Sequence, residues 1–149
     1  MNDNINIATT LRILLSIEYT LYVKIQNFHW NLIGMSFICV HELLGKHYSQ
    51  VGEFIDQIAE QIRKYGYSAP GSLQELLEIN NQVNGIKERP GIIIKKELAI
   101  AEMVTDHEII IRNINSFDIT RLDLATQNML GNILDFHMKA AWIWRSHLG

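Results

Sequence analysis

Residues 37–65 read FICVHELLGKHYSQVGEFIDQIAEQIRKY, and this stretch decides the fold. Apolar side chains recur in it every three or four residues, which is the periodicity of one face of an α-helix. The members of this face are Val40, Leu43, Leu44, Tyr48, Val51, Phe54, Ile55, Ile58 and Ile62. The pattern is not interrupted by proline, so it predicts a single continuous helix.

The segments on either side carry further helical patterns. A helix is predicted from about Ile7 to Leu32, with Gly34 as its C-terminal stop and Ser36 available to begin the next helix. Residues 66–71 contain two glycines, a serine and a proline, so they predict a loop. Ser72 can then cap a short helix that ends in the turn region of residues 80–85. The apolar residues of this short helix are Leu73, Leu76, Leu77 and Ile79.

The second half of the chain predicts two more long helices, separated by a break at residues 113–118. Pro90 suits the first turn of the third helix. Its candidate core positions are Ile94, Leu98, Ala101, Val104, Ile109 and Ile111, and those of the fourth helix are Leu122, Leu130, Ile133, Leu134, Met138 and Trp142. The prediction is an all-α four-helix bundle, one domain over residues 1–149, with a short helix in its central crossover.

Composition limits the class of protein. Of 149 residues, 48% are hydrophobic and 19% are charged, which is typical of a globular domain and excludes disorder. No apolar run reaches membrane-spanning length, and Met1–Thr10 lacks the basic residues of a signal peptide. The single cysteine, Cys39, predicts a reducing cytoplasm and a small core residue. A net charge of −3 argues against non-specific nucleic-acid binding.

Four polar residues within the apolar patterns form a candidate iron site. His29 ends the first predicted helix and His41 begins the second, so a tight turn brings the two imidazoles together. Asp56 and Glu60 are spaced i, i+4, which places both carboxylates on one face of the second helix. Two imidazoles and two carboxylates are a usual ligand set for iron.

Helix length decides how this set can assemble. His41 and Asp56 are separated by about 22 Å along one helix at 1.5 Å per residue, too far for one metal centre. The histidines and carboxylates therefore belong either to separate sites or to a site shared between two antiparallel copies. A two-fold axis would generate two equivalent sites using all four residues, so we favour it. The structural alternative is a pair of hydrogen-bonded core histidines and a solvated Asp/Glu pair.

The chain resembles the Dps family, the mini-ferritins named as DNA-binding proteins from starved cells. The resemblance rests on Asn27-Phe28-His29-Trp30-Asn31 followed by Gly34, Phe37 and Val40-His41-Glu42, on Asp56-Gln57-Ile58-Ala59-Glu60-Gln61-Ile62 with Gly66, and on Ala141–Leu148. It covers essentially the whole chain. It implies a ferritin-like subunit that assembles as a hollow dodecamer built from two-fold dimers.

The resemblance also implies an activity. His29 and His41 of one subunit and Asp56 and Glu60 of its neighbour would form a ferroxidase centre. This centre would oxidise Fe(II), preferably with hydrogen peroxide, and Fe(III) oxide would be stored in the cavity. Trp30 would lie beside the iron, where its ring can shield the site or intercept a one-electron oxidant. Iron would enter through acidic pores, for which the candidates by location are Asp118, Asp123 and Asp135.

The sequence departs from the family pattern at two places. Many members carry an acid four residues after the second histidine, where this chain has Gly45, so we expect one well-occupied iron and a doubtful second position. Members that bind DNA tend to have a basic tail, and Met1–Thr10 has none, so we expect no direct DNA binding near neutral pH. Zinc or manganese would accept the same ligands.

Two other functions stay open. One is a structural, immune-stimulating or adhesive helical bundle with residual metal binding. The other is a conventional di-iron ferritin, which would place Glu-x-x-His pairs inside one bundle; the sequence has no such pair. The remaining histidines show no carboxylate at a metal-ligand spacing and carry no predicted role. They are His47, His107, His137 and His147.

Overall fold

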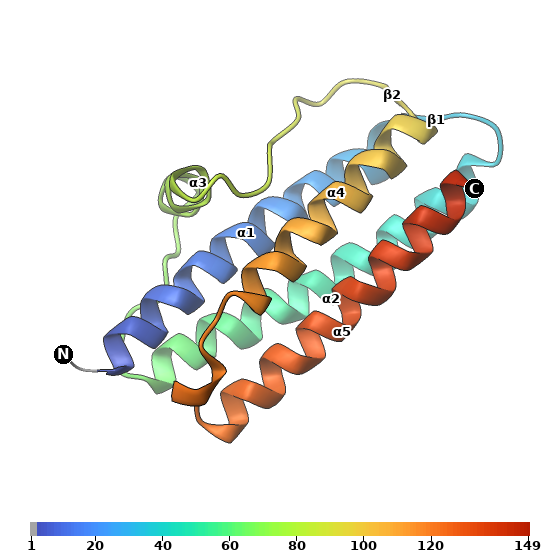
Figure 1. Cartoon of the computed structure of the whole chain (residues 1–149). Coiled ribbons are helices and arrows are strands. Elements are labelled where there is room, and N and C mark those ends of the chain that lie inside the picture. The colour runs from blue at the N-terminus through green and yellow to red at the C-terminus, as the bar shows by residue number, and fades with distance from the viewer. Residues whose placement is uncertain (1–2) are drawn as a thin grey trace.

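Four long helices form the bundle in a computed structural model that describes residues 3–149 (Figure 1). They are α1 (Asp3–Asn31), α2 (Phe37–Lys64), α4 (Lys96–Asn115) and α5 (Leu124–Leu148). The helix predicted from residues 37–65 is confirmed as one uninterrupted element. Met1 and Asn2, part of the segment expected to lack a basic tail, lie outside the described residues. No helix in residues 3–149 combines the length and apolar composition needed to cross a membrane.

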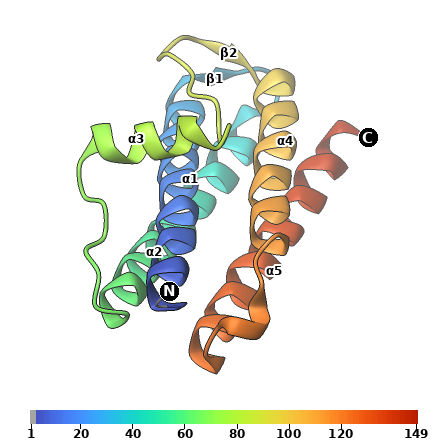
Figure 2. The ribbon, with the colours of Figure 1, turned by 60° about the vertical axis from the view of Figure 1, so that its left-hand side comes forward.

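The topology requires a long central connection. α1 and α2 form an antiparallel hairpin, as do α4 and α5, while α2 and α4 run in the same direction (Figure 1). The chain must therefore return along the length of the bundle between them, and α3 (Leu73–Gln82) lies across the outside of α1 on this path (Figure 2). The predicted cap is confirmed: Glu75 N–H donates to the Ser72 hydroxyl at 3.1 Å, and Ser72 N–H donates back to the Glu75 carboxylate at 3.0 Å.

The prediction that the third long helix starts at Pro90 is wrong, because α4 begins at Lys96. Tertiary contacts hold the preceding residues extended. The Asn27 amide donates to the carbonyls of Arg89 and Pro90 at 2.9 and 3.1 Å. Two short strands, β1 (Leu32–Ile33) and β2 (Ile94–Lys95), then pair in parallel. These contacts hold the end of the crossover against the end of α1, and α4 begins only after them.

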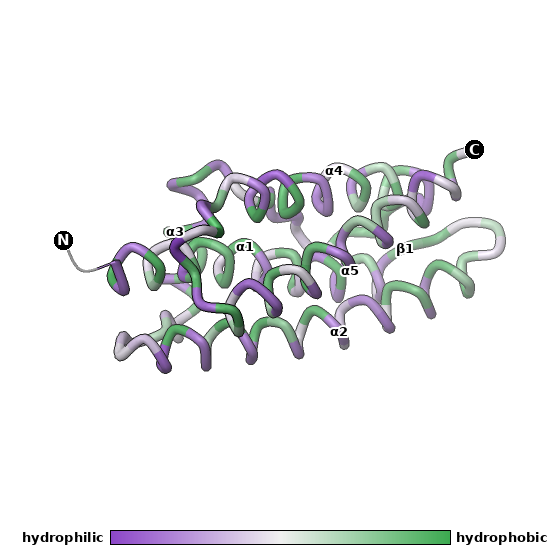
Figure 3. Tube along the Cα trace, turned by 60° about the horizontal axis from the view of Figure 1, so that its bottom comes forward, coloured by the Kyte–Doolittle hydropathy of each residue, from purple (hydrophilic) through white to green (hydrophobic). Residues whose placement is uncertain are grey.

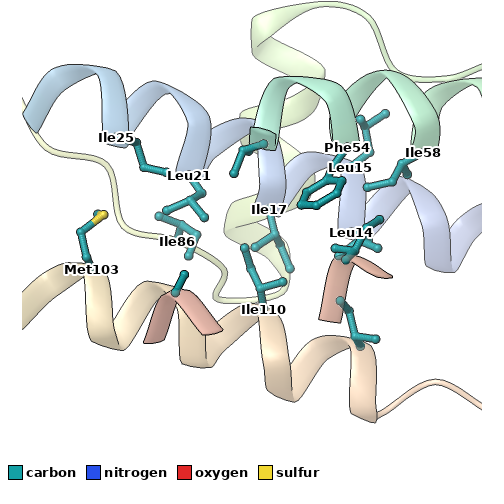
Figure 4. Packing of buried hydrophobic residues seen from close by; sticks show 14 of the residues in the cluster. Leu14, Leu15, Ile17, Leu21, Ile25, Phe54, Ile58, Ile86, Met103 and Ile110 are labelled. Atoms are coloured by element: carbon teal, nitrogen blue, oxygen red, sulfur yellow. The ribbon is translucent and has the colours of Figure 1, made fainter. Parts of the chain in front are cut away.

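The core runs along the whole bundle, with polar and apolar residues interleaved along every helix (Figure 3). In Figure 4, Leu14, Phe54 and Ile58 lie close together, and Ile86 of the crossover lies beside Leu21. Burial of this kind stabilises the fold by roughly 1.5–3 kcal/mol per large aliphatic side chain.

Four expectations about burial are wrong. Cys39 is exposed, because residues 37–39 all face outward at the first turn of α2. Leu98 is half exposed, because α4 buries a neighbouring stripe instead. In α5 the buried indole is Trp144, whereas Trp142 is 60% exposed and Met138 is 53% exposed. Both helices carry apolar residues around much of their circumference, so hydropathy alone does not fix which stripe faces the core. The buried stripe of α4 comprises Ala99, Ile100, Met103, Asp106, His107, Ile110 and Ile114.

Candidate metal centre

The two predicted histidine ligands are brought together at the α1–α2 turn. His29 lies in the last turn of α1 and His41 in the second turn of α2. Their rings stack with centroids 3.8 Å apart and an interplanar angle of 11°. Both side chains are half-buried, so the pair forms a fixed feature that remains open to solvent on one side.

Hydrogen bonds determine which nitrogen of each ring is free. His29 Nδ1 lies 2.7 Å from the backbone carbonyl of His41, and His41 Nδ1 lies 2.6 Å from the carbonyl of His29. A carbonyl only accepts hydrogen bonds, so each Nδ1 must carry the proton. In its neutral form each ring therefore keeps its lone pair on Nε2, which is the form of histidine that binds a metal.

Gly45 and Tyr48 lie against the His29 ring. The Tyr48 ring packs edge-on against His29 with centroids 5.4 Å apart. A Cβ at position 45 would lie 3.1 Å from His29 Cε1, which is tighter than ordinary van der Waals contact. Gly45 was predicted to be a missing ligand; the structure adds that it makes room for the His29 ring.

The two predicted carboxylates do not reach the histidines within one chain. Asp56 and Glu60 are exposed on α2, and neither forms a hydrogen bond or ion pair with any residue of the described chain. Because α2 is continuous, Asp56 stands about 22 Å from His41 along the axis. As the side chains lie in this single chain, no three His, Cys, Asp or Glu residues among residues 3–149 are grouped closely enough to hold a metal ion without rearrangement. The candidate centre is therefore incomplete without a second copy.

Exposed apolar side chains lie in and beside the turn that joins the two histidine-bearing helices. Met35 is 87% exposed and Trp30 is 68% exposed, and Ile33, Phe37 and Ile38 each expose about half of their surface. Trp30 has no aromatic contact within residues 3–149, so its position beside the metal stays a prediction. A patch of this kind, adjacent to unfilled ligands, is what a subunit interface requires.

The three pore candidates have different local roles. Asp118 caps the short 3-10 helix η1 (Ile119–Arg121), and Asp123 caps α5 by accepting from Thr126 N–H at 2.9 Å. Hydrogen bonds from the Tyr65 hydroxyl and from Thr126 lower the pKa of Asp123 to about 2. Asp135 is exposed on α5. Capping accounts for Asp118 and Asp123 locally, and pore lining by any of the three stays a prediction.

A buried histidine cluster was missed from the sequence. His137 Nε2 lies 2.7 Å from the Glu18 carboxylate, and His137 Nδ1 lies 2.8 Å from His107 Nδ1. The His47 ring packs edge-on against His107 at 5.8 Å. Glu18 and His137 are 119 residues apart, so no local spacing could pair them. The one signal available was that these polar residues interrupt apolar helical faces.

This cluster predicts that acid destabilises the chain. Burial, followed by repulsion from His137 in its protonated form, lowers the pKa of His47 from 6.5 to about 4. Below pH 6.5 the unfolded chain binds a proton at this position and the folded chain does not, so stability falls as the pH drops to about 4. His47 alone contributes a loss of roughly 3 kcal/mol, and His107, whose pKa burial also lowers, adds to it. The raised pKa of Asp106, about 6, opposes part of this loss.

Urea unfolding at pH 7 and pH 4.5 measures the effect. We expect a lower midpoint at pH 4.5 for the wild type. The variant His47→Leu, which has no proton to bind at this position, should show a clearly smaller difference between the two pH values. Equal midpoints for the wild type at both pH values would contradict the prediction.

The sequence of this chain is similar to a known family and to individual proteins. The profile of the ferritin-like domain family matches residues 8–149. Antigen TpF1 of Treponema pallidum is 32% identical over 126 residues, covering 83% of this chain and 69% of the antigen. A low-temperature-induced protein of Nostoc is 32% identical over 136 residues, covering 88% of this chain and 73% of that protein.

Solved structures agree with this placement. The crystal structure of TpF1 superposes with a TM-score of 0.91 at 30% identity, covering 97% of this chain and 92% of that chain. A Dps protein from Bacillus brevis superposes with a TM-score of 0.87 at 26% identity, covering 100% of this chain and 99% of its own. The four-helix arrangement and the crossover helix are thus shared with these proteins along their length.

Proposed function

Because this chain belongs to the ferritin-like family, and within it to the Dps proteins, we propose that it is an iron-storing mini-ferritin. It oxidises Fe(II), preferably with hydrogen peroxide, at sites shared across a two-fold subunit interface. Fe(III) oxide is then stored inside a dodecameric cage built from two-fold dimers. In the cytoplasm this removes iron and peroxide together, which protects DNA and other targets without direct DNA binding.

The stacked pair of His29 and His41 is the observation that carries this proposal. Both rings have their Nδ1 protons committed to backbone carbonyls, so two lone-pair-bearing Nε2 atoms are presented side by side at the surface. Preorganisation of this kind lowers the cost of metal binding, since the ring orientations and tautomers are already set. A pair of ordinary surface histidines would have no reason to be fixed in this way.

A second copy supplies what one chain lacks. In an antiparallel two-fold arrangement the Asp56 and Glu60 end of one α2 meets the His29 and His41 end of the other. The exposed apolar side chains of Ile33, Met35, Phe37 and Ile38, in the turn next to the histidines, support this choice of surface, because they gain burial when a partner covers them. Each two-fold axis then carries two equivalent centres.

The ligand set suits the proposed reaction. Carboxylate oxygens of Asp56 and Glu60 are hard donors that stabilise Fe(III) over Fe(II), and the neutral imidazoles complete a mixed nitrogen and oxygen set with open positions. Two Fe(II) ions and one hydrogen peroxide, with two protons, yield two Fe(III) ions and two water molecules. Iron is thus the substrate of the centre, and no hydroxyl radical is released when both electrons reach the same peroxide.

Peroxide-driven iron oxidation by the assembled protein tests the proposal. Fe(II) is added without oxygen, hydrogen peroxide follows, and the appearance of Fe(III) is measured optically together with Trp fluorescence. The substitution His29→Ala should slow oxidation by more than the roughly 10–100-fold loss typical of second-shell changes. His147→Ala, which alters an exposed histidine on α5, is the matched control and should leave the rate unchanged. A rate that is insensitive to His29→Ala would refute the assignment.

Gly45 leads to a separate prediction about iron occupancy. Position 45 offers no side-chain ligand, and a Cβ there would press on the His29 ring, so the second metal position has no adjacent acid. Iron-soaked crystals should therefore show one strong anomalous peak per centre and a much weaker second one. Gly45→Asp should not simply restore the second peak, because His29 must shift to admit the new side chain. Two equally occupied peaks in the wild type would contradict this.

A further inference from the structure

In the middle of the bundle, four buried polar side chains, one from each long helix, form a connected cluster. Glu18 of α1, His107 of α4 and His137 of α5 are fully buried, and His47 of α2 is 6% exposed. They follow one another in contact: Glu18 bonds to His137, His137 bonds to His107, and the His107 ring meets the His47 ring. The iron chemistry proposed above uses none of them. Bundle cores are where facing helices commonly build metal and cofactor sites.

The hydrogen bonds within the cluster leave polar atoms without partners. With Glu18 ionised, His137 Nε2 carries a proton and donates it to the carboxylate. In neutral His137 the Nδ1 atom then holds a lone pair, and His107 Nδ1–H donates to it. This leaves His107 Nε2 bare and buried, and His47 Nδ1 and the second oxygen of Glu18 are also without a partner. Buried polar atoms without partners are costly and commonly mark an ion or water.

We propose that this cluster binds one divalent transition-metal ion, of which Zn(II) is the type, inside each chain. His107 and His137 provide the first two ligands through their Nδ1 atoms, which already face each other 2.8 Å apart. The metal takes the place of the hydrogen bond between them, and the His107 proton moves to Nε2. Rotation of the His47 ring brings the third imidazole to the metal, and a water molecule fills the fourth position.

The surroundings match the requirements of such a site. Ligating histidines usually donate their second N–H to a carboxylate, and Glu18 already holds His137 in this way. The Glu18 carboxylate has His137 as its ion-pair partner and no lysine or arginine within ion-pair distance in the described chain, so a divalent cation on His137 would add positive charge beside it. Burial lowers the pKa of His47 and His107, so both are neutral and able to act as ligands at neutral pH. Three imidazoles favour zinc, cobalt or copper, whereas the carboxylates of the interface centre suit iron.

The main rival occupant is an ordered water molecule. Water could bond to His107 Nε2 and to the Trp144 indole N–H, which is likewise buried without a partner. It would satisfy these atoms without supplying charge to Glu18. The two occupants differ in what they predict for added metal, since a water-filled cluster has no affinity for it.

Titration with Co(II), a spectroscopic probe for Zn(II), separates these outcomes. The assembled protein carries His29→Ala and Asp56→Ala, so the interface centre is removed and the proposed iron chemistry does not enter the result. We expect one Co(II) per chain with the intense visible absorption of a four-coordinate nitrogen-rich site. Zn(II) should displace it and abolish the absorption. Absence of a bound Co(II), or only the weak absorption of a six-coordinate ion, would overturn the proposal in favour of water.

Variants then test the ligand assignment. In the same background His107→Gln should abolish the absorption, whereas His147→Ala, on the exposed surface of α5, should leave it unchanged. Glu18→Gln keeps the ligands but loses the carboxylate partner, so affinity should fall about 10–100-fold with the stoichiometry preserved. If His107→Gln does not fold, as judged by circular dichroism, the Glu18→Gln result decides. Unchanged Co(II) affinity in Glu18→Gln or in folded His107→Gln would show that the cluster is not the site.

Discussion

Equal mixing of His29→Ala and Asp56→Ala chains before assembly is expected to restore roughly a quarter of the wild-type oxidation sites, although each variant alone is inactive. Each centre takes its histidines from one chain and its carboxylates from the other. A mixed dimer therefore has one centre with both lesions and one with none. Random pairing makes half of the dimers mixed, and half of their centres are intact. The readout is peroxide-driven Fe(III) formation per chain.

Two further mixtures serve as matched controls. Asp56→Ala with Glu60→Ala places both lesions in the carboxylate half of the centre, and His29→Ala with His41→Ala places both in the histidine half. Every centre of a mixed dimer is then damaged, so neither mixture should recover activity. Recovery in these controls, or its absence in the test mixture, would mean that the four residues do not share a centre across the interface.

Lys24→Ala is expected to destabilise the fold by about 3–5 kcal/mol, the usual cost of removing one partner from a buried ion pair. The Lys24 side chain is 3% exposed, and its ammonium lies 2.7 Å from Asp106 and 3.1 Å from Glu102. Burial already raises the pKa of Asp106 to about 6 despite the attraction of Lys24. Without the ammonium, the Asp106 carboxylate remains buried and uncompensated. Urea unfolding at a fixed protein concentration measures the loss.

Two comparisons check the cause of this loss. The double variant Lys24→Met/Asp106→Leu replaces the pair with apolar groups and should regain most of the stability, because Glu102 keeps its ion pair with Arg89 and no charge is left unpaired. The loss in Lys24→Ala should also be smaller at pH 5 than at pH 8, since protonation of Asp106 below its raised pKa removes the buried charge. A loss under about 1 kcal/mol at pH 8 would indicate that the pair is solvated.

The sequence predicted those elements whose evidence lies within a few residues. The continuous α2 and the capped α3 were predicted from local periodicity and capping residues. The predicted helix stop at Gly34 is wrong, because α1 ends at Asn31 and the strand β1 precedes Gly34. The start of the third long helix was predicted wrongly, because Pro90 is held by the Asn27 amide, 63 residues away. The buried stripe of α4 was also predicted wrongly. It includes the polar residues Asp106 and His107, which a pattern of apolar residues does not mark as buried.

By itself, the sequence determined that His29 and His41 are neighbours and that Asp56 and Glu60 are not within their reach. A tight turn joins the helices that carry His29 and His41. The fixed rise per residue of the second helix separates Asp56 and Glu60 from these histidines. Tertiary structure alone decided the rest: the ring tautomers set by backbone carbonyls, the space that Gly45 leaves for His29, and the meeting of Glu18, His47, His107 and His137. These depend on how each helix is rotated about its axis and which helix it faces. Periodicity within one segment does not encode either of these.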